Sequence, residues 1–131
     1  THVEGDFDLT ALDHLPDGAG FEIIKLAAYQ YSHANGQRKH RSELCSLYIR
    51  ENKEKFKFQT VALPSEIKRT DIRLTIDYPE DLVLCRAVYQ RFKNLAPRIP
   101  MIEIIKFLDR NPQLKALVEP FREEGLKTMY V

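Results

Sequence analysis

The sequence predicts an α/β domain in which a short mixed sheet is flanked by helices. Stretches with strand-like alternation are followed by amphipathic helical patterns along the chain, which is the order typical of layered α/β proteins. The 131 residues are close to the commonest domain size, and their 44% hydrophobic content is typical of a folded globular chain. We therefore expect residues 1–131 to form a single domain.

The first part of the chain predicts one strand and one helix. Residues 1–15 are expected to be irregular, because acidic side chains are scattered among few apolar ones. Pro16-Asp17-Gly18 is a turn signal. Phe21 to Lys25 predicts a short strand, and Leu26 to Ala34 predicts a helix. The Asn35-Gly36 pair that follows is typical of a helix C-terminus.

The middle of the chain predicts a second helix and two further strands. Ser42 is a good helix N-cap, and the helix is expected to run to about Asn52. Its buried side is predicted to contain Leu44, Cys45, Tyr48 and Ile49. Phe56 to Leu63 predicts a strand. From Ile72 to Asp77 apolar and polar residues alternate, which predicts another strand.

Three helices are predicted in the last part of the chain. The first runs from Pro79 to about Lys93, the second from Met101 to Leu108, and a short third from Pro112 to about Val118. The buried stripe of the first helix is expected to contain Leu82, Cys85, Tyr89 and Phe92. Residues 119–131 are expected to form a tail.

Composition and charge exclude several classes of function. The net charge is +1, and the basic cluster at 38–41 is short, so nucleic acid is not an expected partner. No apolar run is long enough for a membrane span, and no signal-peptide pattern opens the chain. Cys45 and Cys85 lie in separate helical patterns and predict reduced thiols, which indicates a cytoplasmic protein. The four histidines have no zinc-ligand spacing.

Asp77 has two interpretations that the residues alone leave open. The pattern Asp77-x-x-Glu80, with a proline between, is typical of a capping box at a helix N-terminus. Asp77 also ends a predicted strand, where α/β proteins place their ligands, and it shares a strand face with Arg73 and Thr75. A carboxylate at such a position suits Mg²⁺, which takes one or two carboxylates and completes its shell with water and phosphate oxygens.

Several motifs resemble a known family. R-L-T-I-D-Y-P-E-D-L at 73–82 is similar to the R-L-T-V-D-x-P-E-D-L stretch of the cytidylyltransferases that activate acidic sugars. These are the acylneuraminate and 3-deoxy-manno-octulosonate enzymes, together with related spore-coat polysaccharide proteins. P-D-G-A-G-F-E at 16–22 resembles the family's P-D-G-x-x-x-E entry, and residues 42–52 resemble its R-E-H-V-T-x-Y-I-R-x-N helix. With N-P-Q-L at 111–114, the resemblance covers roughly residues 16–118.

The resemblance implies a partial nucleotide-diphospho-sugar transferase (Rossmann-like) fold and a role as the C-terminal half of such an enzyme. These enzymes transfer CMP from CTP to a sugar acid with Mg²⁺ and release pyrophosphate, and this half supplies sugar-side contacts and a homodimer interface. Asp77 matches a family metal ligand. By the same resemblance Glu22, Glu43, Tyr48 and Arg73 are candidate substrate-binding residues, although Glu22 and Arg73 can equally be read as surface charges. No catalytic residue is assigned.

Two departures limit what the resemblance implies. The family's nucleotide-binding loop, which carries small residues with Arg and Lys, has no counterpart among the five glycines, so the chain alone is expected to be inactive. Leu44 replaces the family histidine and Ser42 the family arginine, whereas His40 is nearby but out of register. The alternatives are a non-catalytic association module of a polysaccharide-biosynthesis protein and a related sugar-nucleotide enzyme that uses another base.

Overall fold

The computed structural model describes residues 1–129 and divides them into two compact units. The sheet unit comprises residues 1–13 and 21–62 together with 127–129, and the helical unit comprises residues 14–20 and 63–126. A single domain was predicted, and each unit has a hydrophobic core of its own. No helix in the described part of the chain combines the length and apolar character needed to cross a lipid bilayer.

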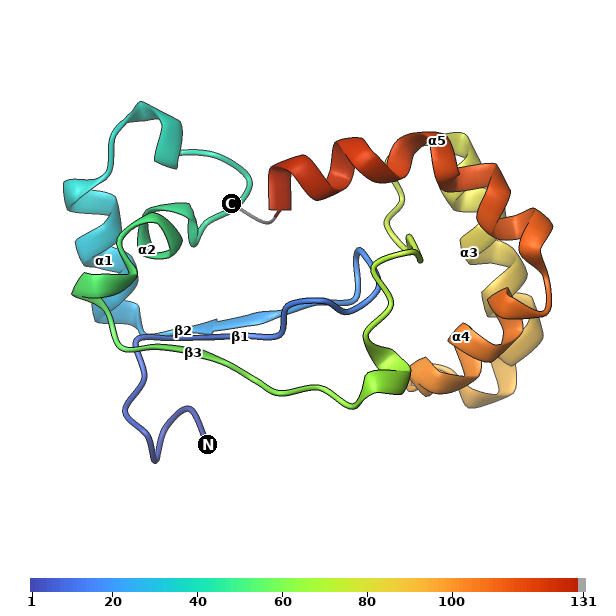
Figure 1. Cartoon of the computed structure of the whole chain (residues 1–131), viewed down its shortest axis with the longest axis horizontal. Helices are drawn as coiled ribbons and strands as arrows, with labels where there is room; N and C mark the ends of the chain where they lie inside the picture. The colour runs from blue at the N-terminus through green and yellow to red at the C-terminus, as the bar shows by residue number, and fades with distance from the viewer. Residues whose placement is uncertain (130–131) are drawn as a thin grey trace. The chain divides into compact units, whose positions relative to one another are not determined.

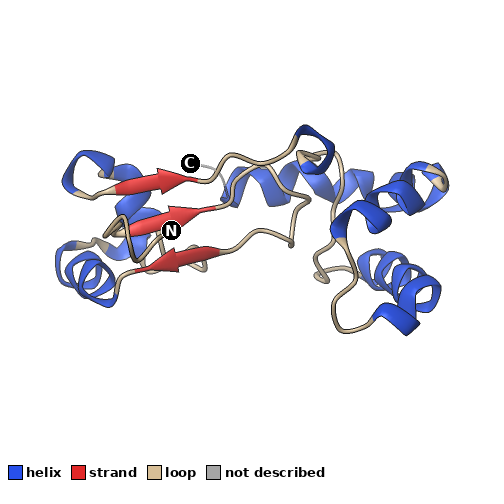
Figure 2. Ribbon diagram, turned by 90° about the horizontal axis from the view of Figure 1, so that it is seen from below, coloured by secondary structure: helices blue, strands red, loops and turns tan. Residues whose placement is uncertain are grey.

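The sheet unit contains a mixed sheet of three short strands (Figure 2). The strand order is β2 (Glu22–Ile24), β1 (Leu9–Ala11), β3 (Phe58–Thr60). The central strand β1 pairs antiparallel with β2, with Leu9 opposite Ile24, and parallel with β3, with Leu9 opposite Phe58. The predicted α/β class with a short mixed sheet and flanking helices is therefore confirmed.

Strand β1 corrects the prediction that residues 1–15 are irregular. The alternation of Phe7, Leu9 and Ala11 marks this strand, but the acidic residues around it hide the signal. Leu9 and Ala11 are fully buried against Ala28 and Ile49. Because these two strand residues point to the same face of the sheet, the helices that cover them lie on one side of it (Figure 1).

Two α-helices cover that face of the sheet, and the second is shorter than predicted. Helix α1 extends from Leu26 to Asn35, as expected, whereas α2 extends only from Leu47 to Glu51. The Ser42 hydroxyl donates to the carbonyl of Leu44, and such local bonds compete with helix formation. Cys45 is consequently exposed, whereas Tyr48 and Ile49 are buried as predicted.

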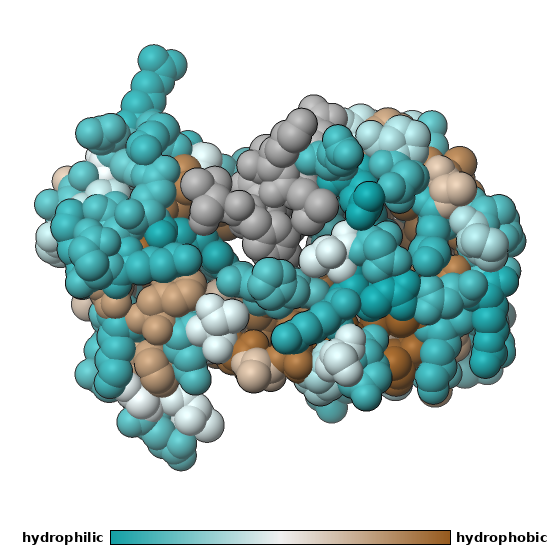
Figure 3. All heavy atoms as spheres, viewed as in Figure 1, coloured by the Kyte–Doolittle hydropathy of each residue, from teal (hydrophilic) through white to brown (hydrophobic). Residues whose placement is uncertain are grey.

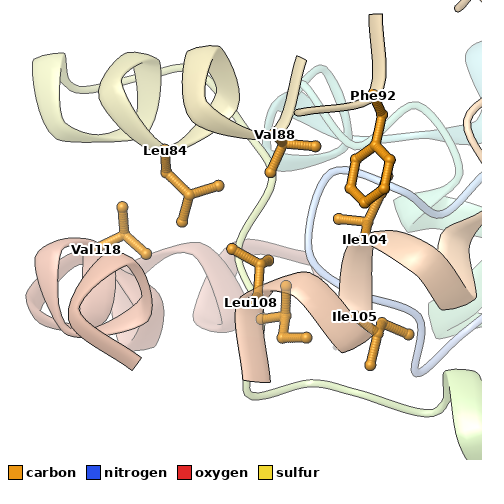
Figure 4. Packing of buried hydrophobic residues seen from close by; sticks show 8 residues of the cluster. Leu84, Val88, Phe92, Ile104, Ile105, Leu108 and Val118 are labelled. Atoms are coloured by element: carbon orange, nitrogen blue, oxygen red, sulfur yellow. The ribbon is translucent and has the colours of Figure 1, made fainter. Parts of the chain in front are cut away.

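The helical unit is built from three helices whose apolar faces meet in one core. They are α3 (Pro79–Phe92), α4 (Met101–Asp109) and α5 (Pro112–Met129). Figure 4 shows their side chains pointing toward one another. The buried members are Ile72, Leu84, Val88, Phe92, Ile104, Ile105, Leu108 and Val118. Short 3-10 turns complete the chain: η1 (Arg38–His40), η2 (Lys53–Lys55), η3 (Ser65–Ile67) and η4 (Lys93–Leu95).

Helix α3 has the predicted bounds but a different buried stripe. Asp81, Leu84, Val88 and Phe92 are buried, whereas the predicted Leu82 and Tyr89 are 37% and 53% exposed. Asp81 faces inward, where its carboxylate binds Arg73, and the buried stripe is shifted by about one residue from the predicted one.

Two other predictions for this unit were wrong. Residues 72–77 do not form a strand; a single bridge pairs Arg73 with Asp17, because the neighbouring segment is a turn that offers no further pairing partner. Ile76 is accordingly 60% exposed. Helix α5 continues past Val118 to Met129, so the predicted tail at 119–131 is helical as far as it is described. Residues 130–131 lie outside the described residues.

Candidate functional site

Arg73 begins the motif at 73–82 and is almost fully buried. Its Nε and Nη2 donate to the two oxygens of Asp81 at 2.9 and 3.0 Å. Nη1 donates to Asp17 at 3.0 Å, and Nη2 also donates to Asp77 at 2.7 Å. These hydrogen bonds, first of all those with Asp81, raise the pKa of Arg73. The guanidinium thus binds protein carboxylates, and its predicted substrate contact stays a prediction.

Asp81 takes the capping-box role that the sequence assigned to Glu80, and Tyr78 takes the N-cap position assigned to Asp77. Helix α3 begins at Pro79 with Tyr78 as the N-cap residue, so Asp81 is the third helical residue. Its carboxylate accepts the backbone N–H groups of Asp77 and Tyr78 at 3.0 and 3.1 Å. Burial acts to raise the pKa of Asp81, but Arg73 and the two N–H groups outweigh it, and the pKa is lowered. The Asp77–Glu80 capping box was therefore placed one residue too early.

Asp77 is the accessible member of this group. Its side chain is 64% exposed, whereas those of Asp17 and Asp81 are 2% and 0% exposed. Its Oδ2 accepts from Arg73, and its Oδ1 forms no hydrogen bond with another described residue. One carboxylate oxygen is thus held by Arg73, while the other has no protein partner among the described residues. Asp77 can therefore contribute one oxygen to a ligand.

The turn at residues 16–18 is joined to the segment around Arg73 by backbone hydrogen bonds. The N–H of Asp17 donates to the carbonyl of Ile72, and the N–H of Leu74 donates to the carbonyl of Asp17. Burial raises the pKa of Asp17, against the effect of Arg73. Gly18 has a φ of +84°, and a Cβ at this position would lie 2.8 Å from the backbone nitrogen of Thr75. Only glycine fits this conformation and this approach.

The residues present fit a magnesium site only in part. Three aspartates approach one another in this group, but the described residues contain no cluster of three or more His, Cys, Asp or Glu side chains arranged to hold a metal. Asp17 and Asp81 are bound to the guanidinium. Asp77 alone is free to face a cation, which is consistent with the habit of Mg²⁺ of taking few protein carboxylates. The orphaned hydroxyl of Thr75, buried without a partner among the described residues, lies two residues away in the sequence.

Glu22 lies in the sheet unit, in a second ion-pair group. Its carboxylate accepts from the Ser46 hydroxyl at 2.9 Å and from Arg50 Nε at 2.8 Å. Arg50 is buried and also donates to Asp13 at 2.8 Å. Asp13, Ser46 and Arg50 were not predicted as site residues. Glu22 is therefore an ion-pair partner in this structure, and its substrate contact stays a prediction.

The two remaining candidates, Glu43 and Tyr48, have different surroundings. Glu43 is exposed in the turn before α2. Tyr48 is 7% exposed, and its ring packs edge-on against His40 and Phe56 with centroids 5.0 and 6.1 Å apart. The structure thus gives Tyr48 a packing role, and a substrate contact of either residue stays a prediction.

Comparison with known proteins finds two curated relatives and one solved structure that are similar to the chain. No family model matches the chain. The chain is 29% identical over 125 residues to an uncharacterized protein of Methanocaldococcus jannaschii, covering 95% of the chain and 51% of that protein. It is 28% identical over 112 residues to the spore coat polysaccharide biosynthesis protein SpsF of Bacillus subtilis, covering 85% of the chain and 46% of that protein.

One solved structure is also similar to the chain. A cytidylyltransferase from Leptospira borgpetersenii serovar Hardjo-bovis matches 85% of the chain with a TM-score of 0.71 and 24% sequence identity. At this identity the likeness shows the fold, which is that of part of a cytidylyltransferase. The match covers 46% of that enzyme's chain, so this chain spans about half the length of the proteins it resembles.

Proposed function

We propose that this chain is part of a nucleotidyltransferase that makes a CMP-activated sugar from CTP and a sugar acid and releases pyrophosphate. Within that protein it corresponds to the C-terminal half, contributes the metal ligand Asp77 and sugar-side contacts, and acts in the cytoplasm as a homodimer. The fold match to a cytidylyltransferase and the R-L-T-I-D-Y-P-E-D-L motif at 73–82 support the proposal. The chain alone is inactive in this proposal, because it contains no phosphate-binding glycine loop.

The observation that carries the proposal is the presentation of Asp77. A buried guanidinium holds one of its oxygens at 2.7 Å and leaves the other to solvent. Bound at Asp77, Mg²⁺ would neutralise negative charge on the triphosphate. Arg73 and Asp81 fix the position of the Asp77 carboxylate beforehand, so that little reorganisation is needed when substrate binds.

The experiment that tests this is the Asp77→Asn variant in the full-length gene product that contains this chain. We expect pyrophosphate release from CTP and a sugar acid to fall about 10²–10³-fold, the range for removing one preorganised electrostatic contact. The melting temperature should stay nearly unchanged, because Asn keeps a side-chain oxygen that can accept from Arg73 and the buried guanidinium still has Asp17 and Asp81 as partners. Mn²⁺, which accepts neutral ligands better than Mg²⁺, should restore part of the rate.

The matched control is Glu80→Gln, which removes a carboxylate from the same segment without touching Arg73 and should keep wild-type turnover. Because Asp81 caps α3, Asp77→Ala should also keep the melting temperature, in contrast to the extra cost expected if Asp77 were the cap. Near-normal turnover of Asp77→Asn would refute the metal-ligand role.

The second candidate function is a non-catalytic association module. It is favoured by the exposed apolar side chains at and beside the edge strand β2, where Phe21 is 56%, Ile23 44% and Leu26 69% exposed. A tight dimer whose stability is indifferent to CTP and Mg²⁺, in a full-length protein without turnover, would favour this candidate over the enzyme.

A further inference from the structure

A cavity of about 350 Å³ lies in the sheet unit, within a region whose surface is largely hydrophilic (upper left of Figure 3). Helix α1 contributes Tyr29, Ser32 and His33 to its lining, and the segment at 36–45 contributes the other side. None of these residues belongs to the group around Arg73. The volume lies at the lower end of the range of about 300–1,000 Å³ that is typical of small-molecule sites.

The backbone around the cavity is fixed by close contacts. The N–H of Gly36 donates to the carbonyl of Ser32 at 2.8 Å, and a Cβ at Gly36 would lie 2.7 Å from that oxygen. The segment can therefore pack this closely onto α1 only with glycine at position 36. Because Ser32 and Gly36 both line the cavity, this contact fixes part of its lining.

His40 fixes another part of the lining that the segment at 36–45 contributes. Its Nδ1 accepts the backbone N–H of Gln37 at 2.7 Å, so the ring proton is on Nε2, which lies 2.8 Å from Glu51 Oε2. The ring also packs edge-on against Tyr48. This part of the lining is thus held in place by the protein itself, and a ligand would have little ordering cost to offset.

The described residues that line the cavity include an arginine and no carboxylate. Among the described residues that line it, none is Asp or Glu, whereas the guanidinium of Arg41 and the hydroxyl of the buried Ser32 are present. In the part of the chain that the structure describes, Arg41 forms no ion pair. Glu51, which pairs with this segment, is engaged by His40 and Lys39, and Glu43 belongs to the same segment but does not line the cavity.

We propose that this cavity binds a small oxyanion, a carboxylate or a phosphate group, with Arg41 as the principal contact and Ser32 as a second donor. A guanidinium presents two parallel N–H groups that match either oxyanion, and a site without carboxylates does not repel it. The inference concerns only the sheet unit and is independent of the function proposed for Asp77.

The test is a titration of the ¹⁵N-labelled chain followed by amide chemical shifts, with inorganic phosphate in one arm and glucuronate in the other. Sodium chloride at equal ionic strength is the blank. We expect saturable shifts confined to residues 29–45. The arm with the tighter binding identifies the oxyanion as phosphate or as a sugar carboxylate.

Two variants make the test specific. Arg41→Gln should weaken binding about tenfold or more, as expected for loss of a charge-assisted hydrogen bond. Arg38→Gln is the matched control, because Arg38 is exposed in the same segment but does not line the cavity, and it should bind as the wild type does. Non-saturable shifts, shifts reproduced by sodium chloride, or equal weakening by both variants would overturn the proposal.

Discussion

Arg73 shows how one buried side chain can fix the positions of three carboxylates. The side chain is 3% exposed, and all three of its nitrogens donate to carboxylates on residues 17, 77 and 81. Lysine could not replace it, because an ammonium is a single point charge and lacks the planar fork that binds Asp81 with two hydrogen bonds. Arg73 is therefore best described as a positioning residue for Asp77.

We predict that Arg73→Gln destabilises the protein by about 3–5 kcal/mol, the usual cost of leaving buried charges without their partner. Arg73→Lys should recover only part of this loss. Urea unfolding followed by circular dichroism measures both. Arg86→Lys on the exposed side of α3 is the control and should change stability by less than about 0.5 kcal/mol. Equal stabilities for the Lys variant and the wild type would show that the fork geometry is unimportant.

At the scale of the element, the start of α3 depends on Asp81. Its carboxylate combines two functions, since it accepts the two backbone N–H groups that precede the helix and it neutralises Arg73. Among the described residues, the adjacent Glu80 takes neither role.

We predict that Asp81→Ala costs about 3–5 kcal/mol, since it leaves Arg73 short of a partner and also removes a helix cap. Glu80→Ala should cost about 0.3–1 kcal/mol, the contribution of an acidic residue near a helix N-terminus. Thermal unfolding of the two variants measures the difference. Similar losses for both would indicate that general helix-dipole effects, and not the buried ion pair, hold the start of α3.

The same element shows what could be predicted from the sequence. The bounds of α3 follow from Pro79 and the apolar spacing, but its buried stripe does not. Asp81 is buried and bound to Arg73, whereas the apolar Leu82 and Tyr89 are left partly exposed. A periodicity argument treats every carboxylate as a surface group. It cannot find a buried one whose partner lies in another segment, and for that reason Asp17, Asp81 and Arg50 were missed as site residues.

Strands were harder to predict than helices in this chain. β1, β2 and β3 are three residues each, and their stability depends on pairing with distant segments, which local patterns do not show. The alternation at 72–77 predicts a strand, and Ile72 and Leu74 do pack into the core. Among the described residues, however, only Arg73 forms a bridge, with Asp17, so no strand forms. The motif at 73–82 nevertheless led to the correct fold and to the residues around Asp77.

At the scale of the whole molecule, the carboxylates make stability depend on pH. Arg69 lowers the pKa of Asp109 and of Asp71, and Asp81 also has a lowered pKa. For a carboxyl group whose pKa is lower in the folded state, the stabilisation is present above the unfolded value of 3.8 and is lost as the pH falls through the folded pKa. Asp6 and Glu51 also have lowered pKa values, so Asp17, whose pKa is raised and which has the opposite effect, is one group against five.

We therefore predict that the melting temperature falls between pH about 5 and pH about 2. Asp109→Asn should make this decline shallower, because the variant no longer loses the bidentate contact with Arg69 on acidification. Glu119→Gln, which removes an exposed pair with Arg122, is the control and should follow the wild-type curve. A melting temperature that is flat over this range would contradict the assignment of these ion pairs.

The turn at residues 14–20 has a consequence for the order in which the chain is made. It belongs to the helical unit, although forty-two residues of the sheet unit, 21–62, separate it from the remainder of that unit. Asp17 therefore leaves the ribosome well before Arg73, the cation that neutralises it. Neither unit corresponds to one continuous stretch of the gene. A break between residues 62 and 63 would separate Arg73 from Asp17, so the two units cannot be inherited or exchanged as independent modules.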